Sequence, residues 1–129
     1  MASEKKLDNK VINYIESKGG WIIKYWAGAK YTKKGIPDLL ACVNGYFLGI
    51  EDKGDNGRPK MLQLKNLEWI DHAGGFGILL YPKDFNNFKR FVDELCEENN
   101  DLYLTDWQMQ WYSNNILLQL SWRDKLEKN

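Results

Sequence analysis

The chain is poor in the residues that mark metal-stapled, secreted or membrane proteins. It has only two cysteines, Cys42 and Cys96, and neither lies in a CxxC or Cys/His pattern, which excludes a predicted zinc site or disulfide framework. We expect both thiols to be buried in a reducing compartment. No apolar run approaches the roughly 20 residues that span a bilayer. Residues 1–10 are charged and lack the apolar stretch of a signal peptide. An intracellular protein is therefore expected.

Proline is scarce too, and neither sign of charge is in excess. With three prolines, 14% aromatic and 43% hydrophobic residues, the 129-residue chain predicts one ordered domain. Its 18 basic and 18 acidic side chains cancel, which at first argues against a nucleic-acid partner. By segment, however, residues 24–65 carry eight basic and four acidic side chains, whereas residues 66–129 carry six and eleven. One basic region could therefore still contact nucleic acid.

The hydrophobic pattern predicts an α/β domain with a mixed sheet. Helical spacing and β-type runs alternate along the chain. Helices are expected at residues 3–18, 60–73 and 85–95, and strands at 21–27, 36–43, 46–53 and 76–81. We assign residues 1–98 to this domain and 99–129 to a Trp-rich extension. The extension is expected to be helical, although 102–112 could begin as a strand, and it would either pack on the core or form a dimer interface.

Asn44-Gly45 is a strong hairpin signal, and it places two carboxylates opposite each other. A two-residue turn there pairs Asp38 with Glu51 on one face of the sheet. Alternation then places Lys53 beside Glu51 and turns Asp52 to the other face. Like charges directly opposite are destabilising, so a magnesium ion between the carboxylates would explain them. They could equally belong to an ordinary solvated face.

The motifs around this hairpin resemble the PD-(D/E)XK nucleases, and more narrowly the virus-type replication-repair nuclease (VRR-NUC) domain of small stand-alone phage proteins. The likeness covers about residues 4–95, in order and spacing. It rests on Gly35-Ile36-Pro37-Asp38, Glu51-Asp52-Lys53, Gly57-Arg58-Pro59 and Leu62-Gln63. One departure is Asp52, where the family frequently has an apolar residue.

The resemblance implies a restriction-endonuclease-like fold with an α-β-β-β-α-β core and a Mg²⁺- or Mn²⁺-dependent DNA endonuclease activity. It implies that Asp38, Glu51 and the backbone carbonyl of Asp52 are metal ligands. Lys53 and Gln63 match the remaining catalytic positions. The Lys53 ammonium is expected to orient the attacking water and offset charge, because two nearby carboxylates oppose loss of its proton.

Several further assignments follow from the resemblance and from position in the chain. Glu4 lies where the family often has a glutamate on its first helix, and it is a further candidate metal ligand. His72, at a predicted helix end, is expected to have a capping role and not a catalytic one. The loops that bracket the carboxylates are expected to contact DNA phosphates, through Lys30, Lys33, Lys34, Arg58 and Lys60.

The resemblance also implies a substrate and an assembly. The small phage members suggest a homodimer that cuts Holliday (four-way) junctions, located in the cytoplasm of a bacterial host if this chain is phage-encoded. Two-fold symmetry suits a substrate with two equivalent strands. The alternatives are a nuclease for flaps, single strands or linear duplex, and a DNA-binding module without catalytic activity.

Overall fold

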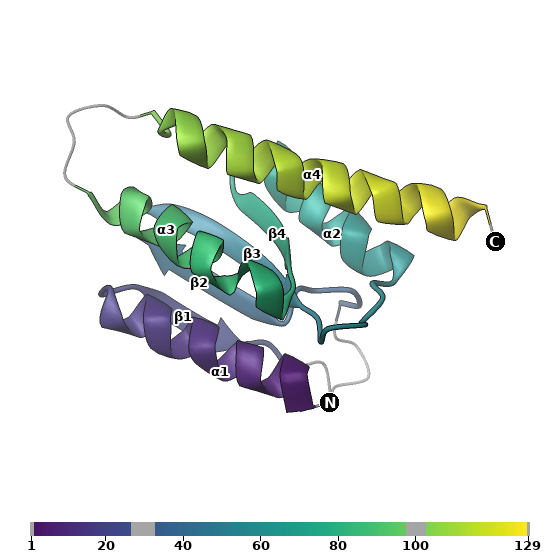
Figure 1. Ribbon diagram of the computed structural model, residues 1–129, viewed down its shortest axis with the longest axis horizontal. Helices are drawn as coiled ribbons and strands as arrows, with labels where there is room; N and C mark the ends of the chain where they lie inside the picture. Colours follow the sequence, from purple (N-terminus) through teal and green to yellow (C-terminus); the bar gives the residue numbers. More distant parts are fainter. Residues whose placement is uncertain (1, 27–32, 98–102, 129) are drawn as a thin grey trace.

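The computed structural model describes residues 2–26, 33–97 and 103–128 (Figure 1). Helices and strands alternate along the described chain as the pattern predicts. The elements are α1 (Ala2–Ser17), β1 (Trp21–Lys24), β2 (Leu39–Val43), β3 (Tyr46–Asp52), α2 (Met61–His72), β4 (Phe76–Leu80), the 3-10 helix η1 (Pro82–Asp84), α3 (Phe85–Cys96) and α4 (Asp106–Glu127). No helix within these ranges is long and apolar enough to cross a membrane.

The strands form a single mixed sheet in the order β1-β2-β3-β4. The first three strands run antiparallel, and β4 pairs parallel with β3 after the α2 crossover. The predicted α/β class with a mixed sheet is confirmed. One face packs against α1 and α3 around a core that includes Val11, Ile50 and Phe88, all fully buried. The opposite face packs against α2, where Leu64 and Leu67 meet Leu79 of β4.

The start of β2 and the exposure of one cysteine differ from expectation. β2 begins at Leu39 and not at Ile36, because Pro37 has no N–H to donate to a ladder. The prediction of two buried thiols is wrong for Cys42, which is exposed, while Cys96 is half-buried. Cys42 alternates with the buried Ala41 and therefore points to the other face of the sheet.

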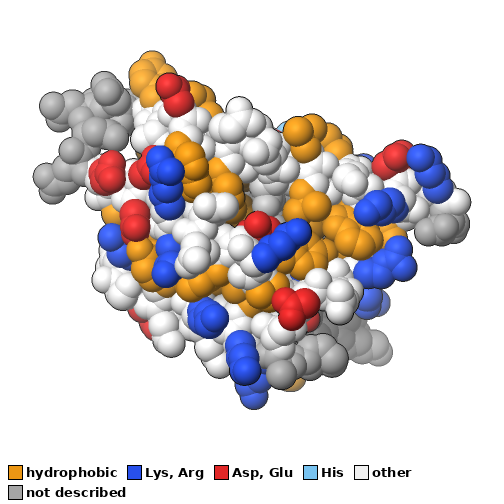
Figure 2. All heavy atoms as spheres, viewed as in Figure 1, with side chains coloured by type: hydrophobic (Ala, Val, Ile, Leu, Met, Phe, Trp, Pro, Cys, Tyr) orange, Lys and Arg blue, Asp and Glu red, His pale blue; other side chains and the backbone are white. Residues whose placement is uncertain are grey.

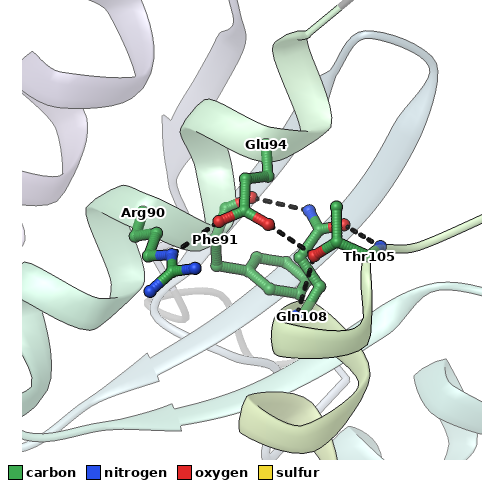
Figure 3. Close-up of polar contacts among 5 residues, drawn as sticks. All are labelled: Arg90, Phe91, Glu94, Thr105 and Gln108. Atoms are coloured by element: carbon green, nitrogen blue, oxygen red, sulfur yellow. Dashed lines mark hydrogen bonds and ion pairs between the residues drawn. The ribbon is translucent and has the colours of Figure 1, made fainter. Parts of the chain in front are cut away.

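A capping box forms the start of α4, and its two residues, Thr105 and Gln108, also contact α3 (Figure 3). The Thr105 hydroxyl accepts from the Gln108 backbone N–H at 3.0 Å, and the Gln108 side chain accepts from the Thr105 N–H at 2.9 Å. The Gln108 amide also donates to the Phe91 carbonyl at 3.0 Å. Glu94 accepts from the Thr105 hydroxyl and, at 2.6 Å, from Arg90. These contacts satisfy helix-end donors and place α4 against the domain.

The long helix α4 covers the open edge of β4 with polar side chains. Asn115 accepts from the Leu79 N–H at 2.9 Å and donates to the Leu79 carbonyl at 2.8 Å. Gln119 donates to the Gly77 carbonyl at 2.8 Å, and the Tyr112 hydroxyl accepts from the Gly77 N–H at 3.0 Å. Side chains thus take the place of a further strand, and the edge is closed to pairing with another chain.

Candidate functional site

The hairpin of β2 and β3 has the predicted turn and register. Asn44 and Gly45 have φ values of 48° and 86°, the left-handed conformation that a two-residue type I′ turn requires. Val43 pairs with Tyr46 and Leu39 with Ile50. Continuing this register by one residue pair brings Asp38 opposite Glu51. The buried Pro37 fixes the backbone just before Asp38.

Asp38, Glu51 and Lys53 come together where these two strands meet the surface. Asp38 Oδ2 accepts from the backbone N–H of Asp52 at 3.2 Å, which holds its carboxyl group across the hairpin. Lys53 Nζ lies 3.3 Å from Glu51 Oε2. This contact is an ion pair, and both Asp38 and Lys53 are side-chain hydrogen-bond neighbours of the buried Glu51 carboxyl. Two buried carboxyls held side by side repel each other when both are ionised, and a cation between them would offset that repulsion.

The electrostatics of the pair follow from burial. Glu51 is 1% exposed, and burial together with the charge of Asp38 raises its pKa to about 8. Burial also raises the pKa of Asp38, as do the charges of Asp8 and Glu4. Lys53 acts in the opposite direction on both groups. A bound cation would act in the same direction as Lys53 and lower the pKa of both carboxyls.

Gln63 links the lysine to the start of α2. Its Oε1 accepts from Lys53 Nζ at 3.1 Å and from the Lys60 backbone N–H at 2.8 Å. Two glycines let α2 lie close enough for this contact. A Cβ atom on Gly49 would meet Ile70 Cδ1 at 2.5 Å, and one on the neighbouring Gly77 would meet the Leu67 carbonyl oxygen at 2.2 Å. Gln63 therefore satisfies a backbone donor and positions Lys53 at once.

A second pair of carboxyls, Asp52 and Asp8, lies on the other face of the sheet, and the sequence analysis predicted the face of Asp52 but missed Asp8. Asp52 turns to the α1 side of the sheet and is 0% exposed. Burial first, and then the adjacent Asp8, raise the pKa of Asp52 well above its ordinary value. Asp8 comes from α1, is buried, and bonds Lys24 Nζ at 2.8 Å. Asp8 could have been recognised from the sequence, because it shares the apolar face of α1 with Val11 and Ile15, where a carboxylate is unusual.

Glu4 and His72 lie at the ends of helices. Glu4, in the first turn of α1, is close enough for its charge to raise the pKa of Asp38. His72 is the exposed last residue of α2.

The predicted DNA contacts lie on two loops, one before β2 and one before α2. Lys30 lies outside the described residues, whereas Lys33 and Lys34 are exposed. Lys33 Nζ lies 5.4 Å from the centre of the Trp69 ring on α2. On the other loop Lys60 is exposed just before α2, and Arg58 lies 5.5 Å from the Trp122 ring centre on α4.

No family model, no curated protein and no solved structure matches this chain. The resemblance to the VRR-NUC domain therefore rests on the sequence motifs alone.

A magnesium ion fits the residues present, although the donor set is small. Among residues 2–26, 33–97 and 103–128, no three His, Cys, Asp or Glu side chains gather in an arrangement that could hold a metal. Magnesium commonly uses only one or two protein carboxylates, together with waters and substrate phosphate. Asp38 and Glu51 provide two such carboxylates, and their burial next to each other is an environment that a cation would stabilise.

Proposed function

We propose that this chain is a metal-dependent DNA endonuclease with a restriction-endonuclease-like fold. The observation that carries the proposal is the group of Asp38, Glu51 and Lys53 at one end of the hairpin, in which two adjacent carboxyls are buried next to one lysine. The element order α1-β1-β2-β3-α2-β4 supports the fold proposal, because it matches the core that the resemblance implies.

In this proposal Asp38 and Glu51 hold Mg²⁺ or Mn²⁺, with the backbone carbonyl of Asp52 as a further ligand. When bound, the ion supplies Lewis-acid activation of the phosphodiester and its attacking water. Lys53 has three N–H donors, and Glu51 and Gln63 occupy two directions around it. A third donor is left to orient the water and to offset charge on the phosphate.

Gln63 acts in this scheme as a positioning residue. It holds the Lys53 ammonium from one side and is itself held by the Lys60 backbone N–H, at the N-terminus of a helix packed tightly on the sheet. The reaction adds the water oxygen to phosphorus, breaks one P–O ester bond, and transfers a water proton to solvent as the leaving oxygen is protonated. Preorganised donors and cations are effective because they need no rearrangement as charge develops.

We further propose branched DNA, such as a four-way junction, as substrate and a homodimer as the active form. The outer side of α4 supports an association surface. Met109, Leu117 and Leu120 lie on that side and are 48, 62 and 48% exposed. Sedimentation analysis of the wild type should show a dimer, and Leu117→Glu should shift it towards monomer. A monomeric wild type would contradict this part of the proposal.

The activity is tested with labelled four-way junction, flap, single-stranded and linear duplex DNA, each with Mg²⁺, Mn²⁺ or EDTA. We expect paired symmetric nicks in the junction with either metal and none in EDTA. Asp38→Ala should abolish cleavage while binding persists. Preferred cutting of flaps, single strands or linear duplex would assign a different DNA substrate to the same centre. Binding without any cleavage would leave only a DNA-binding module.

A further inference from the structure

A pocket of about 810 Å³ lies beside the proposed catalytic centre and is not used by it. Its walls come from the loop after β3, the segment from Tyr81 to Asn87, and the stretch of α4 from Trp111 to Lys125. Its volume is within the range of small-molecule sites in proteins. Figure 2 shows hydrophobic side chains below the C-terminal half of α4, with Lys and Arg side chains around them.

Aromatic rings and cations line this pocket together. Trp111, Trp122 and Tyr81 provide the rings. Arg58 lies 5.5 Å from the centre of the Trp122 ring, near the outer limit of a cation–π contact. Lys125 Nζ lies 4.6 Å from the centre of the same ring, so a planar ligand stacked on Trp122 would be flanked by two cations. Flat rings next to cations are the surfaces on which nucleic-acid bases stack beside their phosphates.

The net charge of the pocket lining limits the charge that a ligand can carry. The lining has three basic side chains, among them Arg58 and Lys83, and two acidic ones, Asp55 and Asp84, which leaves one net positive charge. That balance suits a single phosphodiester and disfavours a di- or triphosphate. Asn56 and Asn87 also line the pocket. Their amides carry both donors and acceptors and can therefore bond the edge of a base.

The pocket and the catalytic centre share one wall, the turn from Gly54 to Gly57. The Gly57 N–H bonds the Gly54 carbonyl at 2.9 Å, and the Tyr81 hydroxyl donates to the Gly57 carbonyl at 2.8 Å. On the other side, a Cβ atom added to Gly57 would lie 3.0 Å from Lys53 Cβ. A ligand in the pocket therefore rests against the same turn that packs on the catalytic lysine.

We propose that this pocket binds one unpaired nucleotide next to the cleavage site, with its base on Trp122 and its phosphate near Arg58 and Lys83. This inference rests on the proposed nuclease function and specifies how branched DNA would be distinguished from continuous duplex. A fully paired four-way junction has no unpaired base, but a base at its branch point lacks continuous stacking and can turn into the pocket at lower cost than a base inside continuous duplex.

The test uses full-length protein in EDTA, so that binding is measured without cleavage. The probes are a linear duplex and the same duplex with one unpaired 2-aminopurine, whose fluorescence falls when it stacks. We expect the wild type to bind the second probe about tenfold more tightly and to quench it, as stacking on one ring predicts. Trp122→Leu and the surface variant Lys83→Gln should each lose this preference. Lys128→Gln, which removes the same charge outside the pocket, should keep it.

Two results would overturn the inference: equal binding of both probes by the wild type, or an unchanged preference in Lys83→Gln and Trp122→Leu proteins with native circular dichroism. The proposed function is judged separately, by Mg²⁺-dependent cleavage in the substrate panel. A protein that cuts DNA but shows no preference for the unpaired base would retain the nuclease proposal and lose the pocket proposal.

Discussion

Replacing Glu51 with glutamine should stabilise the metal-free protein at alkaline pH. Burial and the adjacent Asp38 raise the pKa of Glu51 from 4.5 to about 8. Because the folded pKa is the higher one, this group favours folding below pH 4.5, and that contribution is lost as the pH rises through about 8. The loss is about 1.4 kcal/mol per pH unit, and at most about 4 kcal/mol between pH 5 and pH 8.

The assay is urea denaturation in EDTA at several pH values from 5 to 8. Glu51→Gln should gain free energy of unfolding relative to the wild type as the pH increases. Mg²⁺ at pH 8 should stabilise the wild type and leave the variant unchanged, because a neutral amide is a poor ligand for this ion. The control Glu16→Gln replaces an exposed glutamate on α1. Wild-type and Glu51→Gln stabilities that change in parallel with pH would refute the reasoning.

Three further substitutions test neighbouring parts of the account. Lys53→Met should abolish cleavage but retain DNA binding in an anisotropy titration; normal cleavage would exclude the assigned role of the lysine. Gln63→Ala should slow cleavage and lower the free energy of unfolding by about 1 kcal/mol, because Lys53 and the α2 N-terminus lose an acceptor. Asn115→Leu leaves two Leu79 backbone groups unpaired and should cost about 2–4 kcal/mol by urea denaturation. The exposed neighbour Asn114→Leu should cost much less, and equal losses would argue against edge capping by α4.

The hairpin could be predicted from sequence because a local signal determines it. Asn44-Gly45 accommodates two residues with positive φ, and the turn length then sets every pair up to Asp38 and Glu51. The side-chain period of two adds Lys53 to the same face. The local sequence of the hairpin was therefore sufficient to predict that Asp38, Glu51 and Lys53 lie close together.

The long-range contacts could not be predicted in the same way. The core face of α4 carries Gln108, Asn115 and Gln119, which are buried because they bond the α3 and β4 backbones. A search for apolar periodicity overlooks such a face. Asp8 was missed for a related reason, since its neighbour Asp52 is distant in sequence.

The position of the site on the sheet also depends on close packing that single residues do not reveal. In the sequence, nothing distinguishes Gly49 and Gly77 from ordinary glycines in strands. In the structure they are register partners whose missing side chains let α2 approach the sheet and deliver Gln63 to Lys53. Local patterns thus predicted that Asp38 and Glu51 lie opposite each other, whereas tertiary packing determines how Lys53 is held.

The most direct test of the central claim is the rate of cleavage of a labelled four-way junction with Mg²⁺ by the wild type, Asp38→Ala and the surface control Glu16→Gln. The account predicts cleavage by the wild type and by Glu16→Gln, none by Asp38→Ala despite retained DNA binding, and none by any protein in EDTA. Mg²⁺-dependent cleavage by Asp38→Ala at the wild-type rate would show that Asp38 and Glu51 are not the catalytic centre.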